Sequence, residues 1–283
     1  MRYSRSRAVR FAIGLAAPLA LAAPLLVGGI TELAPASAAT AAPCVSLTGG
    51  TPFVPSTTDN TFTGVTEISP CDVWAVGFDL SRGADETMTE HWNGTQWTVV
   101  PSPNPGGSST SNTLLGLAVT STNDAWAVGT SSTASADHTL ILRWNGTSWV
   151  QVTSPTPDGS DQLRSASATS ASNAWAVGAS SDGTKTLILH WNGTSWKQVG
   201  SPSPTADNGL FGVAATSASN AWAVGFTGTS TLILAWNGTK WAKIPSPAGD
   251  QLNSVIGISA SNAWAVGDAL VSGVRQPLAI HCC

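Results

Sequence analysis

Residues 210–247 decide the fold, and they read LFGVAATSASNAWAVGFTGTSTLILAWNGTKWAKIPSP. The stretch holds four short segments rich in Val, Ile, Leu and Trp, which are separated by Gly, Ser, Asn or Pro. Helical spacing of the apolar residues is absent, and Gly and Pro at this density would interrupt helices. The pair Asn237-Gly238 is a strong hairpin signal, because both turn residues must tolerate positive φ. The stretch therefore predicts four antiparallel strands joined by short turns.

Two blocks of this stretch recur along the chain. The block WAVG occurs five times, with its Trp at positions 74, 126, 175, 222 and 264, so that successive copies lie 52, 49, 47 and 42 residues apart. The block WNGTxW occurs four times, and its copies begin at Trp92, Trp144, Trp191 and Trp236. All 13 Trp belong to these two blocks. Four strands in a period of about 40 to 50 residues are typical of a β-propeller blade.

The repeats predict five blades. Complete four-stranded units cover about residues 61–103, 113–155, 162–204 and 209–248. A fifth unit covers residues 252–283 and ends when its third strand is complete. Residues 51–56 (TPFVPS) supply the missing strand, because they resemble the outermost strand WTVVPS at residues 97–102. We therefore expect an all-β fold, a five-bladed β-propeller of four-stranded antiparallel blades, closed by an N-terminal strand that completes the last blade and removes an open sheet edge.

The N-terminus has the pattern of a secretory signal peptide. Four Arg within residues 2–10 precede an apolar stretch at residues 11–30, and Ala36-Ser37-Ala38 is a small-residue cleavage motif. A membrane anchor is the alternative, because the apolar stretch approaches spanning length. We prefer cleavage, which predicts a secreted, extracellular protein without membrane insertion. The expected division of the chain is a signal peptide at residues 1–38, a short segment at 39–50 and the propeller at 51–283.

The cleaved chain would be acidic. It keeps eight basic and fifteen acidic residues, a net charge of −7, and no basic cluster remains. This argues against binding of nucleic acid or of an anionic membrane surface. We expect a monomer without a cofactor. We also expect no metal site, because the histidines fall in different repeats and no CxxC motif occurs, although a calcium ion held by loop acids is left open.

Four cysteines in a secreted chain predict disulfide bonds. Cys44 precedes the closing strand, and Cys282 and Cys283 end the third strand of the same blade. Cys71 falls in the turn between the first two strands of the first blade. A bond between the adjacent Cys282 and Cys283 is geometrically awkward. We therefore expect Cys44 to pair with Cys282 or Cys283, and Cys71 to pair with the other of these two.

The array SxSNAWAVG followed by LxxHWNGTxW resembles secreted bacterial β-propellers of the broad Kelch and Asp-box (sialidase-like) repeat type. The resemblance covers about residues 50–283 and implies the propeller architecture. The chain departs from Kelch repeats, which carry a Gly-Gly pair before spaced Tyr and Trp, and from Asp-boxes, because WNGT occupies the corresponding hairpin. Sialidase chemistry would use a Tyr nucleophile and an Arg cluster, whereas the cleaved chain has no Tyr and four scattered Arg. The resemblance implies the fold and leaves the activity open, because this scaffold hosts lectins, enzymes and protein-binding platforms.

Length variation places the candidate binding site. The WNGTxW hairpin never changes in length, whereas insertions fall between the second and third strands (the b–c loops) and between consecutive blades (the d–a loops). Alternate turns of a meander share one end, so these loops form one face, and variable loops on a rigid scaffold usually carry binding. The candidate binding residues are Asp79, Arg82, Asp85, Glu86, Asp182, Lys185, Asp268 and Arg275, with Asp158, Asp161 and Asp207 as further loop acids.

These features favour a secreted, non-catalytic binding or scaffold propeller that recognises an extracellular carbohydrate or protein through the b–c and d–a loops. The alternative is a glycoside hydrolase-like enzyme with paired carboxylates, for which Asp85 and Glu86 are the candidates. A cell-surface structural module is a third option. The tryptophans of WAVG are expected in the core, whereas a sugar-stacking role stays open for those of the outermost strands, Trp97, Trp149, Trp196 and Trp241.

Overall fold

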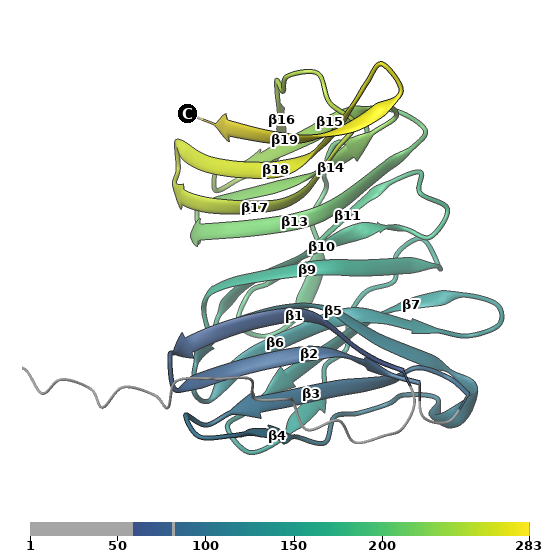
Figure 1. Cartoon of the computed structure of the whole chain (residues 1–283), viewed down its shortest axis with the longest axis vertical. Coiled ribbons are helices and arrows are strands. Elements are labelled where there is room, and N and C mark those ends of the chain that lie inside the picture. The colour runs from purple at the N-terminus through teal and green to yellow at the C-terminus, as the bar shows by residue number, and fades with distance from the viewer. Residues whose placement is uncertain (1–58, 81–82, 283) are drawn as a thin grey trace, which may run out of the picture. The chain divides into compact units, whose positions relative to one another are not determined.

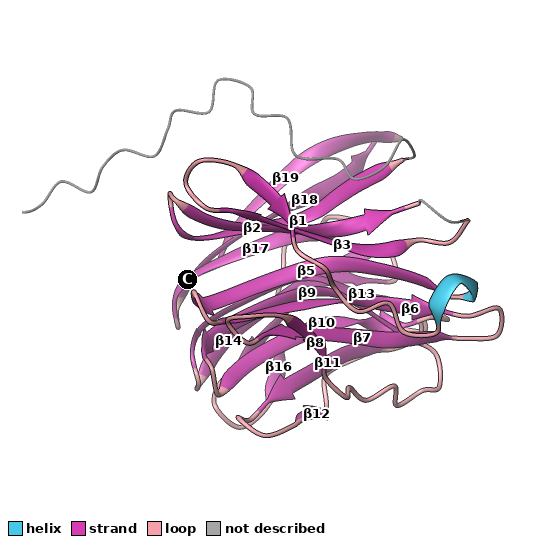
Figure 2. Cartoon of the chain, turned by 90° about the horizontal axis from the view of Figure 1, so that it is seen from below, coloured by secondary structure: helices cyan, strands magenta, loops and turns pink. Residues whose placement is uncertain are grey.

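The computed structural model describes residues 59–80 and 83–282, which lie within one compact unit spanning Pro43–Cys283. Nearly all regular structure in these residues is β-strand, and the one helix is the short 3-10 turn η1 (Gly107–Ser109) (Figure 2). Among these residues, no helix has the length and apolar character that crossing a membrane requires. The strands are β1 (Asn60–Ser69), β2 (Asp72–Asp79), β3 (Glu86–Trp92), β4 (Trp97–Val99), β5 (Ser111–Ser121), β6 (Asp124–Ser132), β7 (Asp137–Trp144), β8 (Trp149–Gln151), β9 (Asp161–Ser170), β10 (Asn173–Ser180), β11 (Thr186–Trp191), β12 (Trp196–Gln198), β13 (Asn208–Ser217), β14 (Asn220–Thr227), β15 (Ser230–Trp236), β16 (Trp241–Ile244), β17 (Gln251–Ser259), β18 (Asn262–Val271) and β19 (Val274–Cys282).

The strands form antiparallel meanders in chain order. Four sheets have four strands each, β1–β4, β5–β8, β9–β12 and β13–β16, and the fifth sheet has the three strands β17–β19. The predicted four-stranded antiparallel sheets are therefore confirmed. Each WNGTxW block is a hairpin between the third and fourth strands, in which Trp191 and Trp196 pair directly across the ladder. Asn192 closes the turn, because its Oδ1 accepts the backbone N–H groups of Thr194 and Ser195, each at 3.0 Å.

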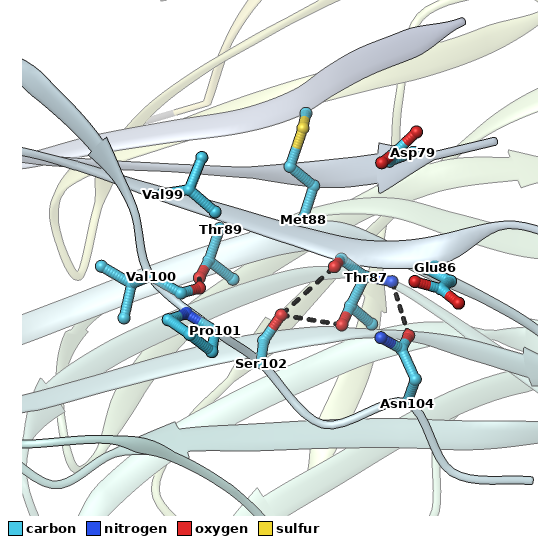
Figure 3. A pocket seen from close by; sticks show the side chains of 10 residues that line it. All are labelled: Asp79, Glu86, Thr87, Met88, Thr89, Val99, Val100, Pro101, Ser102 and Asn104. Atoms are coloured by element: carbon cyan, nitrogen blue, oxygen red, sulfur yellow. Dashed lines mark hydrogen bonds between the residues drawn. The ribbon is translucent and has the colours of Figure 1, made fainter. Parts of the chain in front are cut away.

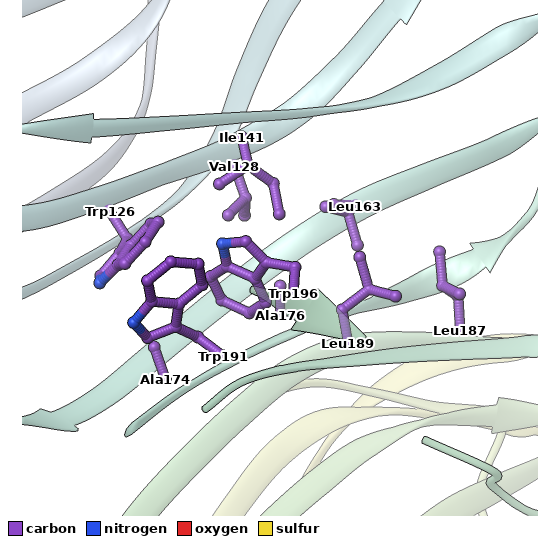
Figure 4. Packing of buried hydrophobic residues seen from close by; sticks show 10 residues of the cluster. All are labelled: Trp126, Val128, Ile141, Leu163, Ala174, Ala176, Leu187, Leu189, Trp191 and Trp196. Atoms are coloured by element: carbon purple, nitrogen blue, oxygen red, sulfur yellow. The ribbon is translucent and has the colours of Figure 1, made fainter. Parts of the chain in front are cut away.

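Each sheet packs on the next in chain order, as the blades of a propeller do (Figure 1). The first four sheets pack on one another through the tryptophans of both blocks. Between the second and third sheets, Trp126 of WAVG lies 4.9 Å from Trp191 and 5.1 Å from Trp196, measured between ring centroids. Figure 4 shows these rings together with the aliphatic side chains that fill the rest of the interface. The same three-ring contact recurs at Trp74 and at Trp175. Four of the five WAVG tryptophans, Trp74, Trp126, Trp175 and Trp222, are therefore core residues, as predicted, whereas Trp264 of the fifth sheet is not buried in the described part of the chain.

A β-bulge in every innermost strand explains the glycine of WAVG. The extra residue is Thr63, Leu115, Arg164, Phe211 or Asn253, and the glycine of the neighbouring strand pairs with the residue just before it. A Cβ on Gly178 would lie 1.9 Å from the carbonyl oxygen of Gln162, and the other four glycines are equally crowded, at 1.9 to 2.0 Å. Any side chain at these positions would push the first two strands of the sheet apart.

The fifth sheet differs from the others. Its outer face exposes apolar side chains, and the Trp264 ring is 46% exposed, whereas the equivalent Trp74, Trp126 and Trp175 are buried. The main contacts between sheets run from each sheet to the next in chain order. Residues 51–56, which we expect to complete this sheet, lie outside the described residues.

Candidate functional site

The b–c and d–a loops lie at the same end of every sheet, as the meander requires, and we call this the loop end. In Figure 1 the β6–β7 connection and the β18–β19 hairpin mark it at the right. The opposite end carries the uniform a–b and WNGTxW turns. The predicted site residues at the loop end separate into three groups, on the first, third and fifth sheets, and Arg82 lies outside the described residues.

The first group lines a cavity of about 210 Å³ on the first sheet (Figure 3). Asp79 and Glu86 lie opposite each other in the β2–β3 register, and both border this cavity with Met88. Asp85 does not border it, because its backbone is tied to the next sheet: its N–H donates to Ser111 Oγ, and its carbonyl accepts from Asn112 N–H. The carboxyl groups that the fold brings together are thus Asp79 and Glu86, rather than Asp85 and Glu86.

The wall of this cavity contains an anchor that the sequence analysis missed. Thr87 Oγ1 lies 2.8 Å from Ser102 Oγ and donates to the carbonyl of Pro103 at 3.1 Å. The same Thr–Ser–Pro contact recurs in the next three sheets at Thr139, Thr186 and Thr231. It fastens the chain after the outermost strand to the third strand. The recurring Ser-Pro after each fourth strand was the signal that could have found it.

Glu90 is a second feature of the first sheet that the sequence analysis did not single out. Its side chain is 1% exposed, and neither carboxyl oxygen has a hydrogen-bond partner in the described part of the chain. Burial raises the pKa of Glu90 to about 7, because desolvation disfavours the charged form. A raised pKa is typical of a general acid. Glu90, however, is not among the residues that line the neighbouring cavity, so its carboxyl group is not placed to meet a substrate there.

The second group is held by its own local contacts. Asp182 Oδ1 accepts hydrogen bonds from Ser180 Oγ at 2.6 Å and from the Thr184 backbone at 2.9 Å, and these bonds lower the pKa of Asp182 to about 2. Lys185 Nζ pairs with Asp158 Oδ1 at 2.5 Å, which raises the pKa of Lys185. The charges of this group are therefore largely satisfied within the loops themselves.

The third group borders a larger cavity, of about 380 Å³, between loops of the fourth and fifth sheets; we call it the fourth–fifth cavity. Arg275 lines it and forms an ion pair with Asp268. Phe226 and Leu270 supply apolar walls, and two loop acids complete the lining that matters here: Asp207 and Asp250. The cavity thus brings together residues of two sheets that lie far apart in the sequence.

Beside the cavity, the β18–β19 hairpin carries an apolar tip. Leu270 is 56% exposed, and Val271 and Val274, on either side of the turn, are also more than half exposed. The turn residues Ser272 and Gly273 have φ of 52° and 80°. Two positive φ values match a type I′ hairpin turn, which holds the tip in one conformation. Exposed apolar side chains grouped in this way are typical of an interaction surface.

Three tryptophans of the outermost strands are not available to a sugar. Trp149, Trp196 and Trp241 are each buried, and each makes an edge-to-face contact with the WAVG tryptophan of the preceding sheet. The possible stacking role left open by the sequence is therefore wrong for these three residues. Trp97 is half-buried and lies against Trp92, with ring centroids 6.0 Å apart.

The histidines bridge the two blocks of a repeat. In three sheets a strand-c His packs on the WAVG tryptophan and lies within hydrogen-bond distance of the side chain that opens strand b: His91 with Asp72, His190 with Asn173, and His281 with Asn262. Arg143 occupies this position in the second sheet, where it pairs with Asp124 at 2.7 Å. Within residues 59–80 and 83–282, no group of three or more His, Cys, Asp or Glu could hold a metal ion.

The disulfide prediction falls partly outside the described residues, because Cys44 and Cys283 do not belong to them. Between the two described cysteines, Cys71 and Cys282, there is no disulfide bond. The predicted alternative that joins Cys71 to Cys282 is therefore not formed in this structure. The other alternative, Cys71 with Cys283 and Cys44 with Cys282, stays a prediction.

Comparison with known proteins gives similarity in structure alone. No family model and no curated protein matches the chain, so no match supports the Kelch or Asp-box type. The solved structure "YCF48 bound to D1 peptide" is 14% identical, with 74% of this chain and 61% of that chain covered at a TM-score of 0.49. YCF48 from Cyanidioschyzon merolae is also 14% identical, with 75% of this chain and 66% of that chain covered at a TM-score of 0.48. The chain thus spans less than two thirds of the length of these two proteins. The PQQ-bound aldose sugar dehydrogenase from Streptomyces coelicolor is 14% identical, with 79% of this chain and 82% of that chain covered at a TM-score of 0.46. Similarity at this level assigns neither a ligand nor an activity to this chain.

Proposed function

We propose that this chain is a secreted, non-catalytic propeller that binds a partner protein outside the cell through its loop end. The observation that carries the proposal is the fourth–fifth cavity together with the apolar hairpin tip beside it. A cavity of about 380 Å³ lies within the range of ligand sites, which is about 300 to 1,000 Å³. The exposed Leu and Val side chains of the tip favour a protein over a carbohydrate, because sugars stack on exposed aromatic faces and three of the outermost tryptophans, Trp149, Trp196 and Trp241, are buried.

Site-specific photocrosslinking tests this proposal. A photoreactive phenylalanine analogue replaces Leu270 at the loop end or, as the control, exposed Thr239 at the opposite end, in the full chain made by its secreting cells. We expect a crosslinked protein from position 270 that is absent from position 239 and is lost when Val274 is also changed to Asp. Crosslinks of equal strength from both positions would contradict it. Binding on a glycan array, lost in the same Val274→Asp variant, would replace the protein by a carbohydrate.

The non-catalytic part of the proposal has its own test. Asp79 and Glu86 are the paired carboxyl groups that a glycosidase would need, and they border one cavity. Turnover of a chromogenic glycoside that Glu86→Gln abolishes, while the exposed Glu67→Gln does not, would make the chain an enzyme. We expect no turnover by the original chain or by either variant.

We also propose that the five sheets close into a ring, with residues 51–56 paired beside β19. The three-stranded fifth sheet and its exposed apolar face support this, because closure would complete the sheet and cover that face. Backbone amide exchange tests it on residues 277–281. Their outward-facing amides should exchange slowly in the full chain and quickly in a chain that lacks residues 51–56. Equal exchange in the two proteins would refute the closure.

A further inference from the structure

The fourth–fifth cavity carries unbalanced negative charge. In the part of the chain that the structure describes, the carboxylates of Asp207 and Asp250 make no hydrogen bond and no ion pair, although the backbone of each residue does. The one cation in the lining, Arg275, is already paired with Asp268. An anionic ligand would therefore meet two carboxylates and no uncommitted cation. A cationic group is the ligand that complements this cavity.

An aromatic wall adds a second feature that suits a cation. Phe226 lines the cavity, and its ring centroid lies 5.4 Å from that of Phe211. The guanidinium carbon of Arg164 lies 5.2 Å from the Phe211 centroid. The protein thus already stacks one of its own cations on this aromatic pair. The faces of such rings attract Arg and Lys side chains, and more strongly where water is displaced.

We propose that the fourth–fifth cavity recognises an Arg or Lys side chain presented by an extended segment of the partner protein. This rests on the proposed function and deepens it. The aliphatic stem of the side chain lies against Phe226 and Leu270, while its charged end meets Asp207 and Asp250. The apolar hairpin tip contacts the residues of the segment next to this cation. The partner is therefore a segment with a cation beside apolar side chains.

A randomised peptide array tests the inference, with 12-residue peptides as the probe and the labelled full-length chain as the analyte. We expect the bound peptides to be enriched in Arg or Lys next to Leu, Ile, Val or Phe. For a bound peptide, the Asp207→Asn/Asp250→Asn variant should weaken binding about five- to tenfold, because it removes both carboxylates. Phe226→Leu should weaken it about threefold and keep the cavity apolar.

The control removes the same charge elsewhere. Asp59→Asn/Glu67→Gln changes two exposed carboxylates, one just before β1 and one within it, and it should leave both the enrichment and the affinity unchanged. Enrichment of acidic peptides, or enrichment of cations that survives in the Asp207→Asn/Asp250→Asn variant, would overturn the inference. Absence of any bound peptide would also overturn it, while a partner crosslinked from position 270 would leave the proposed function standing.

Discussion

Replacing Glu90 should stabilise the protein by an amount that grows with pH. Glu90 pairs with Ala75 across the β2–β3 ladder, and the equivalent partners in the next three sheets are Leu142, Leu189 and Leu234. A carboxyl group thus occupies a core position built for leucine, and no described residue donates a hydrogen bond to it. Its ionised form is the unstable one in the folded chain.

The magnitude follows from the pKa. Burial raises the pKa of Glu90 from 4.5 to about 7, so the unfolded chain releases this proton at a lower pH than the folded chain does. The stability contributed by the protonated group is fully present below pH 4.5 and is lost as the pH rises to about 7. A difference of this size corresponds to at most about 3 kcal/mol, and nearer 2 kcal/mol once solvent screening at the margin of the sheet is allowed for.

Urea unfolding followed by tryptophan fluorescence between pH 4 and pH 8.5 measures this. Glu90→Gln cannot ionise, so it should match the original chain near pH 4 and exceed its stability by about 2 kcal/mol at pH 8. Glu90→Leu should show the same pH dependence, with a further constant gain of about 1 to 2 kcal/mol from the apolar side chain. The control, Glu67→Gln, changes an exposed glutamate of the same sheet and should leave the curve unmoved. A Glu90→Gln difference that is equal at pH 5 and pH 8 would refute the reasoning.

Three further outcomes are expected. Gly178→Ala should destabilise the chain by about 3 kcal/mol or more, because the new Cβ would lie 1.9 Å from the Gln162 carbonyl oxygen. The control in the same urea experiment is Gly200→Ala, whose new Cβ would meet nothing within 4 Å. Equal losses of stability in the two variants would contradict the crowding at Gly178. The hydrogen bonds that Asp182 accepts lower its pKa, so Asp182 should stay ionised down to about pH 2. The order that its carboxylate gives to the loop should be lost only as the pH falls to that value. Carbon-detected NMR titration of the carboxyl group measures this, and a midpoint near pH 4 would count against it. Peptide mapping of the secreted chain without reductant should find an N-terminus at Ala39 and disulfide bonds among Cys44, Cys71, Cys282 and Cys283. Four free thiols would show the disulfide prediction to be wrong.

The sheets were predictable because the signals for them are local and repeated. Asn-Gly turns and alternating apolar residues act over a few positions, and each recurs in several copies. The hairpin predicted from Asn-Gly in each WNGTxW block is present, with Trp191 and Trp196 paired across it. The prediction that the b–c and d–a loops share one end needed only the antiparallel order of the strands.

The site was less predictable because it depends on contacts between sheets. Loop-length variation pointed to the loop end, but it could not show that Phe226 and Arg275 border one cavity while Asp182 is satisfied by its own turn. Asp85 shows the same limit, because a neighbour in sequence is tied to the adjacent sheet and takes no part in the cavity that Glu86 lines. Glu90 could have been found, since aligning the repeats places it against leucines, but its burial only becomes evident in three dimensions.

The bulged residue of each innermost strand offers a practical route to new specificities. Each of Thr63, Leu115, Arg164, Phe211 and Asn253 stands outside the regular ladder, so exchanging it disturbs no strand register, while the crowded glycine beside it keeps the backbone path constant. A library that randomises only these five positions would therefore diversify the innermost strands and keep their register, while replacing the contacts that Thr63 makes with Leu114 and Phe211 makes with Phe226.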